Sequence, residues 1–575
     1  MTDTTTPQDP RVLLPSPQPD GTLCYRHNLT RKERTDLVVV RVGIVNALPI
    51  VFVPGVMGSN LRGLDEKRTK VWNLDSLGSL FFDKWGQKAG KRQEFLHPDR
   101  TEVDPEGAVP SKAVGSVMAA NAKDLETCYQ RRGWGEVGKG SYQDFLMLLE
   151  ETLNGHRSLQ PERTDVVTKI KALMELKAKD PADQPWRPEK GPALSDPEDF
   201  ANLRKWLFPV YACGYNWLDD NANSAERLRR RIDEVIAENN SANSRCEQVI
   251  VITHSMGGLV ARACQQMDGM EAKIAGIVHG VMPVDGAPIA YRRCKLGLSE
   301  EGWGLGQVIG STGQEVTAIF AQAPGPLELL PTQRYKQNWL EVRGPDNNYV
   351  QKMLHEADPY SEIYKRRDRW WALVKEEWLS PEDGVPIRWR DYLEFLGKAE
   401  DFHEQVTPQT YHPNTYAFYG ADNKGATESF ERIVWQMKRG ERDESDTPAP
   451  QEVYEMSAND TRIRIDGENP EHVGLKRVPR TSFEGNPHGT HEVSHWELRA
   501  GKPDGGTGDG TVPAQSGRSP VDCAKVRQVF RLSGLEHEPA YTQRSPVARQ
   551  VTLYAVSKIA LEAKVPQCAP ANAKE

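Results

Sequence analysis

Residues 248–258 read QVIVITHSMGG, and this stretch decides the fold class. Its first part, Gln248 to Thr253, is a short and almost purely apolar run, which is typical of a strand buried on both faces of a sheet. The small and apolar residues from Met256 to Met267 indicate a helix. Ser255 therefore falls on a tight strand-to-helix turn, where its hydroxyl is exposed at the end of the sheet and can serve as a nucleophile.

The turn around Ser255 requires small residues two positions before and two positions after the serine, because the two backbones come close together there. Gly257 meets this requirement after the serine. Thr253 occupies the position before it, and its β-branched side chain predicts a slightly strained turn. The alternative interpretation is a serine in a glycine-rich turn that carries no chemistry.

Apolar runs and amphipathic helices alternate on either side of this stretch. Ser224 to Asn239 has apolar residues at helical spacing, with Ser224 at the N-cap position. Further helices are predicted at Tyr142 to Leu153 and Pro546 to Ala563. Strands separated by helices pair in parallel, so we expect an α/β fold with a mostly parallel central sheet. The other expected strands are Pro49 to Pro54, Trp206 to Tyr211, Ile274 to Val281, Thr415 to Tyr419 and Val526 to Leu532.

This pattern predicts one α/β core that carries large insertions. Short antiparallel strands are expected in the polar stretch from Arg439 to Gly510. The predicted division is an extended arm at 1–35, a core at 36–60, 200–286, 411–420 and 505–565, an insertion at 61–199, a cap or lid at 287–410 and a polar insertion at 421–504.

The composition is that of an ordinary globular protein, with 38% hydrophobic and 27% charged residues among 575. A net charge of −8 gives no general attraction to nucleic acid, which we exclude as a partner. No signal peptide and no membrane-spanning run is expected, so the chain is expected to be made in the cytoplasm. The eight cysteines include no CxxC pair, and no cofactor is predicted.

An acid and then a histidine should follow the nucleophile, each after a later strand. Asp509 lies in the glycine-rich loop GGTGDGTVP at 505–513, and His537 is the only histidine after it. His254 adjoins the nucleophile and faces the wrong way to act as its base. Asp422 is the rival acid, and a turn or calcium-loop role for Asp509 stays open, as does a surface role for His537. The remaining candidates that precede Asp509 are His488, His491 and His495.

The roles follow from this order. His537 takes the Ser255 proton, and Asp509 fixes the imidazole tautomer. The N–H of Met256, next to the nucleophile, donates to the developing oxyanion. The glycine-flanked loop Val53 to Asn60 follows a strand and can supply a second donor, although it can also be a plain turn.

These motifs together resemble the lecithin:cholesterol acyltransferase and lysosomal phospholipase family of α/β-hydrolases. The likeness comprises VPGVMGSNL at 53–61 with Val71-Trp72, Tyr215-Asn216-Trp217, the HSMGG turn, and DGTVP at 509–513 followed by a lone histidine. The resemblance implies a Ser255–Asp509–His537 triad with oxyanion donors at Val56 and Met256. The departures are Thr253, and MPVDGAP at 282–288 in place of a Thr-Pro-His-Gly-like stretch.

The chain also resembles type VI secretion lipase effectors, especially the subgroup likened to GPI inositol deacylases. This implies a phospholipase toxin that is exported by type VI delivery proteins, acts in the target-cell periplasm or on host membranes, and is restrained by a cognate immunity protein. A soluble-substrate carboxylesterase, an acyltransferase with the same triad and a binding protein on an inactive scaffold are the alternatives.

Two features bear on a lipid substrate. Lys365 to Leu379 places basic residues beside three tryptophans, which suits a membrane interface or a cap helix packed on the core. The glycine-rich stretch Leu296 to Leu330 fits a mobile lid or an ordered loop.

Overall fold

A computed structural model gives the arrangement of most of the chain. It describes residues 16–17, 23–27, 38–42, 45–73, 75, 89–117, 121–154, 166–176, 184–195, 199–200, 203, 205–241, 244–298, 309–336, 338–344, 350–352, 358–381, 383–438, 450–457, 463–465, 473–476, 495–500 and 505–566.

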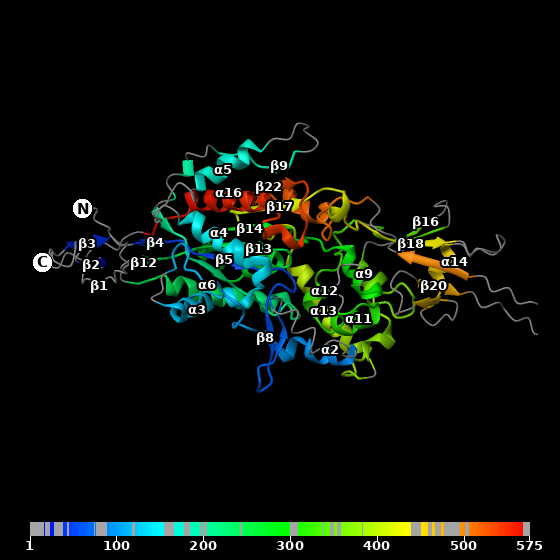
Figure 1. Cartoon of the computed structure of the whole chain (residues 1–575). Coiled ribbons are helices and arrows are strands. Elements are labelled where there is room, and N and C mark those ends of the chain that lie inside the picture. Colours follow the sequence, from blue (N-terminus) through cyan, green and yellow to red (C-terminus); the bar gives the residue numbers. More distant parts are fainter. Residues whose placement is uncertain are drawn as a thin grey trace, which may run out of the picture.

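A seven-stranded sheet forms the centre of the molecule (Figure 1). Its strands pair in parallel, except that β9 at one edge runs antiparallel to β22. In order across the sheet they are β11 (Val210–Ala212), β5 (Ile50–Val53), β13 (Val249–His254), β14 (Ile274–Gly280), β17 (Thr415–Gly420), β22 (Val526–Leu532) and β9 (Trp186–Lys190). The predicted α/β fold with a mostly parallel sheet is confirmed.

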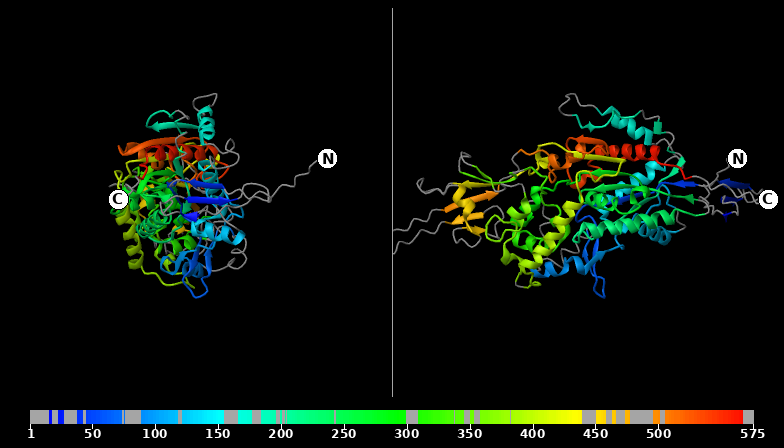
Figure 2. Two further views of the ribbon diagram at one scale, coloured as in Figure 1. Left: turned by 90° about the vertical axis from the view of Figure 1, so that its left-hand side faces the viewer. Right: turned by 180° about the vertical axis from the view of Figure 1, so that it is seen from behind.

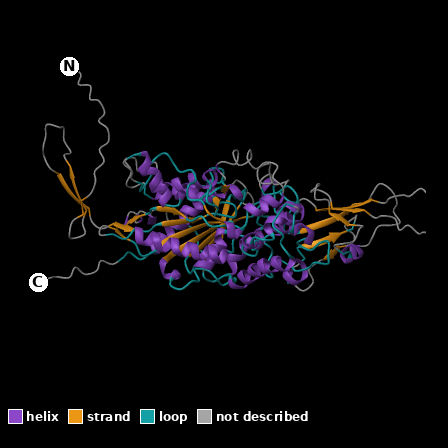
Figure 3. Cartoon of the chain, turned by 90° about the horizontal axis from the view of Figure 1, so that it is seen from below, coloured by secondary structure: helices purple, strands orange, loops and turns teal. Residues whose placement is uncertain are grey.

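Hydrophobic clusters cover both faces of this sheet, as the alternation along β5 demonstrates. Val51 and Val53 belong to one cluster, while Ile50 and Phe52 belong to the other. Helices α6 and α7 pack on the first face, and α4 and α16 pack on the second, with α5 packed against α16 (Figure 1). Figure 3 shows helices on both sides of the strands. The bounds of these helices are Asn221–Glu238 (α6), Gly257–Cys264 (α7), Asp144–Leu153 (α4), Val166–Glu175 (α5) and Pro546–Glu562 (α16).

Two expected elements differ in detail. The strand expected at Trp206 to Tyr211 is interrupted at Pro209, which has no N–H for a ladder. Its first part, β10 (Trp206–Leu207), joins β4 (Val45–Ala47) and β12 (Ser244–Arg245) in a separate small sheet. The N-cap of α6 is Asp220 and not Ser224, because the Asp220 carboxylate already accepts the N–H of Ala222 one turn earlier.

The segment 61–199, set apart as an insertion in the sequence division, contributes to the central sheet and its cover. It supplies the edge strand β9 and the helices α4 and α5. Figure 2 and Figure 1 agree that α5 lies over α16. The same segment supplies a three-stranded antiparallel sheet of β6 (Leu61–Gly63), β7 (Lys70–Trp72) and β8 (Thr101–Val103).

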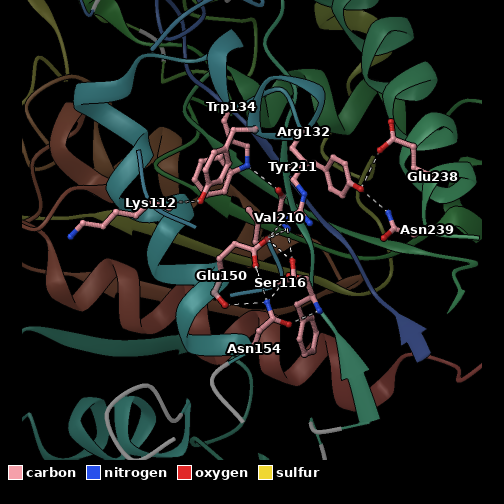
Figure 4. Close-up of polar contacts among 12 residues, drawn as sticks. Lys112, Ser116, Arg132, Trp134, Glu150, Asn154, Val210, Tyr211, Glu238 and Asn239 are labelled. Carbon is pink, nitrogen blue, oxygen red and sulfur yellow. Dashed lines mark hydrogen bonds and ion pairs between the residues drawn. The ribbon is translucent and has the colours of Figure 1, made fainter. Parts of the chain in front are cut away.

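A buried polar network joins α4 to the edge strand β11 (Figure 4). The fully buried Glu150 carboxylate accepts the N–H of Ser116 at 2.9 Å and that of Val210 at 2.8 Å. It also pairs with the Arg132 guanidinium at 2.5 Å. Burial raises the pKa of Glu150, and the opposing effect of Arg132 is smaller. This network fixes the segment 61–199 to the core by charge and hydrogen bonding as well as by apolar contact.

Further helices and a second sheet lie beyond one end of the central sheet (Figures 1 and 2). The helices are α2 (Ala89–Phe95), α9 (Pro288–Leu296), α11 (Gly313–Phe320), α12 (Pro324–Leu327) and α13 (Trp389–Gln405). The second sheet contains β15 (Leu340–Arg343), β16 (Val350–Lys352), β18 (Ile433–Lys438), β19 (Ile463–Ile465), β20 (Val473–Lys476) and β21 (His495–Ala500). β19 to β21 are the short antiparallel strands expected between Arg439 and Gly510.

The tryptophans between Lys365 and Leu379 lie in the interior. Trp370, Trp371 and Trp378 are all buried, and the Trp370 indole donates to the carbonyl of Val453 at 2.7 Å. They therefore pack on the core and present no face to a membrane. Within the stretch proposed as a lid or loop, the described part contains α11 and α12, while Gly302, Gly304 and Gly306 lie outside the described residues.

Candidate active site

Ser255 lies on the turn between β13 and α7, where the sequence places it. Its N–H donates to the carbonyl of Gly280 at 2.9 Å, which holds the turn against β14. A Cβ at Gly257 would lie 2.4 Å from the carbonyl oxygen of Pro54, so only glycine fits there. The φ of Ser255 is 50°, a left-handed conformation that costs a side-chain-bearing residue about 1–3 kcal/mol and is found mainly at functional sites.

The turn that follows Thr253 contains a strained residue, and this residue is Ser255 and not Thr253. Thr253 lies within β13 and is fully buried. Its hydroxyl oxygen lies 2.9 Å from Nδ1 of His279 on β14. The left-handed backbone falls on Ser255 instead. The β-branched side chain is tolerated because it extends from a regular strand, and its hydroxyl has a polar partner.

His537 and Asp509 meet Ser255 from two further loops. Nε2 of His537 lies 2.8 Å from Oγ of Ser255, and Nδ1 lies 2.8 Å from Oδ2 of Asp509. The other carboxylate oxygen of Asp509 accepts the N–H groups of Thr511 at 3.0 Å and Val512 at 2.7 Å. Asp509 is thereby fixed by its own loop, and the three side chains form a continuous hydrogen-bonded chain.

Asp422, the rival acid, does not contact this histidine. Its carboxylate accepts the N–H of Asn423 at 2.9 Å and that of Gly534 at 3.2 Å, so it stabilises the loops beside the site. Of the other histidine candidates, His488 and His491 lie outside the described residues, as does the side chain of His495.

Two backbone N–H groups beside Ser255 make no hydrogen bond within the described residues. Among the described residues, the N–H groups of Val56 and Met256 have no acceptor. The loop that carries Val56 lies directly on the nucleophile, since a Cβ at Gly55 would be 3.0 Å from Cβ of Ser255. Backbone N–H groups without an acceptor are uncommon in protein interiors, so this pair beside Ser255 is notable.

The site is withdrawn from solvent. Ser255 has 3% of its surface exposed, Asp509 has 2%, and the His537 side chain has 12%. Electrostatic interactions are stronger in such surroundings than in water. In the described part of the chain, no group of three or more His, Cys, Asp or Glu side chains could hold a metal ion. No helix there is long and apolar enough to cross a membrane.

Sequence reasoning missed Tyr142, whose hydroxyl contacts the ring of His254 and the N–H of Gly55. Tyr142 lies in the segment taken as an insertion, and no local pattern around it indicates a contact with residues about a hundred positions away. The one available signal was its position at the start of the helix predicted at Tyr142 to Leu153.

The comparisons with known proteins agree with this architecture. The family profile described as "PGAP1-like alpha/beta domain" matches residues 212–301, which include α6, β13, the Ser255 turn and β14. A search of curated proteins gives no match. Among solved structures, the chain is similar to Tle4 in "The crystal structure of Tle4-Tli4 complex", with a TM-score of 0.67 and 27% identity. The similarity covers 89% of this chain and 98% of that chain. The protein therefore carries a PGAP1-like α/β-hydrolase domain and resembles Tle4 over most of its length.

Proposed function

We propose that this protein is a serine esterase in which Ser255 is the nucleophile, His537 the general base and acid, and Asp509 the residue that orients the imidazole. The observation that carries this proposal is the unbroken chain of contacts, each 2.8 Å long, from Ser255 through His537 to Asp509. A hydroxyl so placed loses its proton to the imidazole as it attacks a carbonyl carbon.

The reaction proceeds through an acyl-enzyme. Ser255 attacks the ester carbonyl, and the N–H groups of Val56 and Met256 stabilise the negative charge that forms on the carbonyl oxygen. His537 then gives its proton to the departing alcohol. Water then attacks the acyl carbonyl and loses a proton to His537, which returns this proton to Oγ of Ser255 as the acid departs. Each oxyanion donor of this kind contributes roughly 10²–10³ in rate.

We further propose that the substrate is the acyl ester of a membrane phospholipid. The similarity to Tle4 and the sequence resemblance to type VI secretion lipase effectors support this choice. By the same resemblance, type VI delivery proteins carry the chain to the periplasm of a target cell or to host membranes. Tle4 is seen in a complex with Tli4, and this supports a cognate immunity protein that binds and inhibits this chain.

The test is fatty acid release from phospholipid vesicles, measured by mass spectrometry for the wild type and for Ser255→Ala. We expect release by the wild type, none by the variant, and a lysolipid that identifies the bond cleaved. Activity limited to a soluble short-chain ester would support the proposed triad and refute the lipid substrate. Acyl transfer to an alcohol in place of release would identify an acyltransferase. Activity retained in Ser255→Ala would refute the nucleophile itself.

A further inference from the structure

The imidazole next to the nucleophile makes two hydrogen bonds that connect separate parts of the site. Nε2 of His254 lies 3.0 Å from the carbonyl oxygen of His537, and Nδ1 lies 2.8 Å from the hydroxyl of Tyr142. The Tyr142 oxygen in turn accepts the N–H of Gly55 at 3.2 Å. His254 and Tyr142 are 4% and 3% exposed, so these contacts are shielded from water.

The chemistry of the groups fixes which atom is the donor in each hydrogen bond of this network. The His537 carbonyl can only accept, so Nε2 of His254 carries a hydrogen. Burial, with a smaller effect from His537, lowers the pKa of His254 to about 3, so the ring is neutral and Nδ1 is an acceptor. The Tyr142 hydroxyl must therefore donate to Nδ1, which leaves its lone pairs for the Gly55 N–H. Each donor has one acceptor, and the network has a single arrangement.

One end of this network holds the loop that carries the proposed oxyanion donor. The bond from the Gly55 N–H to Tyr142 fixes the Pro54–Gly55 peptide unit, which directly precedes the unit that carries the Val56 N–H. Gly58 closes the same turn by donating to the Gly55 carbonyl at 3.0 Å. A Cβ at Gly58 would lie 2.7 Å from the Tyr142 hydroxyl, so this glycine leaves the space that the tyrosine occupies.

The other end holds the main chain of the base. His537 donates its N–H to the Asp509 carbonyl at 2.8 Å, and its own carbonyl accepts from His254. The backbone of the base is therefore held from both sides, by the acid loop and by the residue that precedes the nucleophile. The rings of His254 and His537 also pack together, with centroids 5.4 Å apart.

We propose that Tyr142 and His254 are positioning residues. Through one network of hydrogen bonds with fixed donors and acceptors, they hold the Val56 N–H and the His537 imidazole in place relative to Ser255. The inference rests on the proposed esterase function. It assigns a part in the reaction to the segment 61–199, because Tyr142 belongs to that segment. Neither residue touches the reacting atoms.

The first test compares Tyr142→Phe with Tyr129→Phe, using whichever ester the wild type hydrolyses. Both variants remove one hydroxyl from a tyrosine buried in the same segment, since Tyr129 is fully buried and donates to the Lys112 carbonyl at 2.7 Å. We expect Tyr142→Phe to lower kcat about 10- to 100-fold with KM within about two-fold, because a displaced oxyanion donor weakens the transition state only. Tyr129→Phe should lower the melting temperature comparably and leave kcat unchanged.

A kcat for Tyr142→Phe within two-fold of the wild type would overturn the proposal. So would an equal loss of kcat in Tyr129→Phe, because the effect would then follow stability. If Ser255→Ala loses activity while Tyr142→Phe keeps the wild-type kcat, only the positioning role is refuted and the proposed esterase function stands. Activity retained in Ser255→Ala would refute the proposed function from which it starts.

A second pair of variants tests the two ends of the network separately. It also provides a test if Tyr142→Phe does not fold. His254→Gln keeps an N–H that can reach the His537 carbonyl, and His254→Asn keeps an acceptor for the Tyr142 hydroxyl. We expect the Asn variant to shift the acidic limb of the kcat/KM pH profile, because the base is no longer held. The Gln variant should keep that limb and lose kcat. Identical pH profiles and kcat values for both variants and the wild type would contradict the proposal.

Discussion

Ser255 illustrates how single residues at this site are set by their surroundings. Its left-handed φ of 50° is held by a hydrogen bond to Gly280 and by the close approach of Gly257 to the Pro54 carbonyl. Asp509 is fixed by two N–H groups of its own loop before it meets His537. The side chains are therefore oriented before any substrate arrives, which is what electrostatic stabilisation of a transition state requires.

Asp509→Asn tests the acid at the residue scale. The amide oxygen can still accept the N–H groups of Thr511 and Val512, so the NH₂ group faces Nδ1 of His537 and moves the imidazole proton to Nε2. This tautomer cannot accept the Ser255 proton, and we expect kcat to fall by about 10⁴. The matched control is Asp422→Asn, which lies beside the site without contacting His537 and should keep kcat. The reverse ranking in ester hydrolysis would make Asp422 the functional acid.

At the scale of elements, the sequence predicted the parts whose pattern is local. The apolar runs that became β5, β13, β14 and β17 are recognisable because strands buried on both faces are almost wholly apolar. β22 was recognised by its remaining apolar residues, although it contains Arg527, Gln528 and Arg531. β9 was missed because Trp186–Lys190 contains a proline and charges, as an edge strand can. The role of the Trp370 region stayed open because its composition fits a membrane interface and a packed cap equally well.

The attachment of α4 to the sheet edge depends on a buried ion pair. Glu150→Leu would leave the Arg132 guanidinium buried without its partner, and we expect a loss of about 3–5 kcal/mol in the free energy of unfolding, measured with denaturant. The double variant Glu150→Leu with Arg132→Met should recover only the part of that loss due to the unpaired charge, because the N–H groups of Ser116 and Val210 still lack their acceptor. Equal stability of the single variant and the wild type would mean that the pair is not needed to hold α4.

The helix α13 is attached to α12 through His403. Nδ1 of His403 lies 2.7 Å from the Tyr360 hydroxyl, and Nε2 lies 2.8 Å from the Glu328 carbonyl. Burial lowers the pKa of His403 from 6.5 to about 4, with the hydrogen bond to Glu328 opposing this and Arg334 adding to it. The unfolded chain therefore gains this proton at a higher pH than the folded chain.

The free energy of unfolding should accordingly decrease as the pH is lowered below 6.5. Comparison with His403→Gln isolates the contribution of this residue. The free energy of unfolding of the wild type, minus that of the variant, should fall by up to about 1.4 kcal/mol per pH unit between about pH 6.5 and 4. Above pH 7.5 the difference should be constant, because His403 is neutral in both states. Denaturant titrations across this range test the slope. A difference independent of pH would mean that the fold leaves the pKa of His403 unchanged and would contradict this prediction.

At the scale of the whole molecule, three distant parts of the chain meet at one end of the sheet. The nucleophile turn, the Asp509 and His537 loops and the segment with Tyr142 come together only in the folded structure. The chain order of Ser255, Asp509 and His537 pointed to these three side chains, with Asp422 left as a rival acid. Ser255 and His537 each follow a recognisable strand, and Asp509 lies in a conspicuous glycine-rich loop. The contribution of Tyr142 depends on how the segment 61–199 packs on the sheet, which no local pattern encodes.

The central claim is that Ser255 is a nucleophile activated by His537, and covalent labelling tests it most directly. The wild type, Ser255→Ala and His537→Ala are each treated with a fluorophosphonate, and the adduct is followed by intact-mass spectrometry and located by peptide mapping. The account predicts a single adduct on Ser255 in the wild type, none in Ser255→Ala and greatly slowed labelling in His537→Ala. An adduct on another residue, or a labelling rate in His537→Ala equal to that of the wild type, would contradict it.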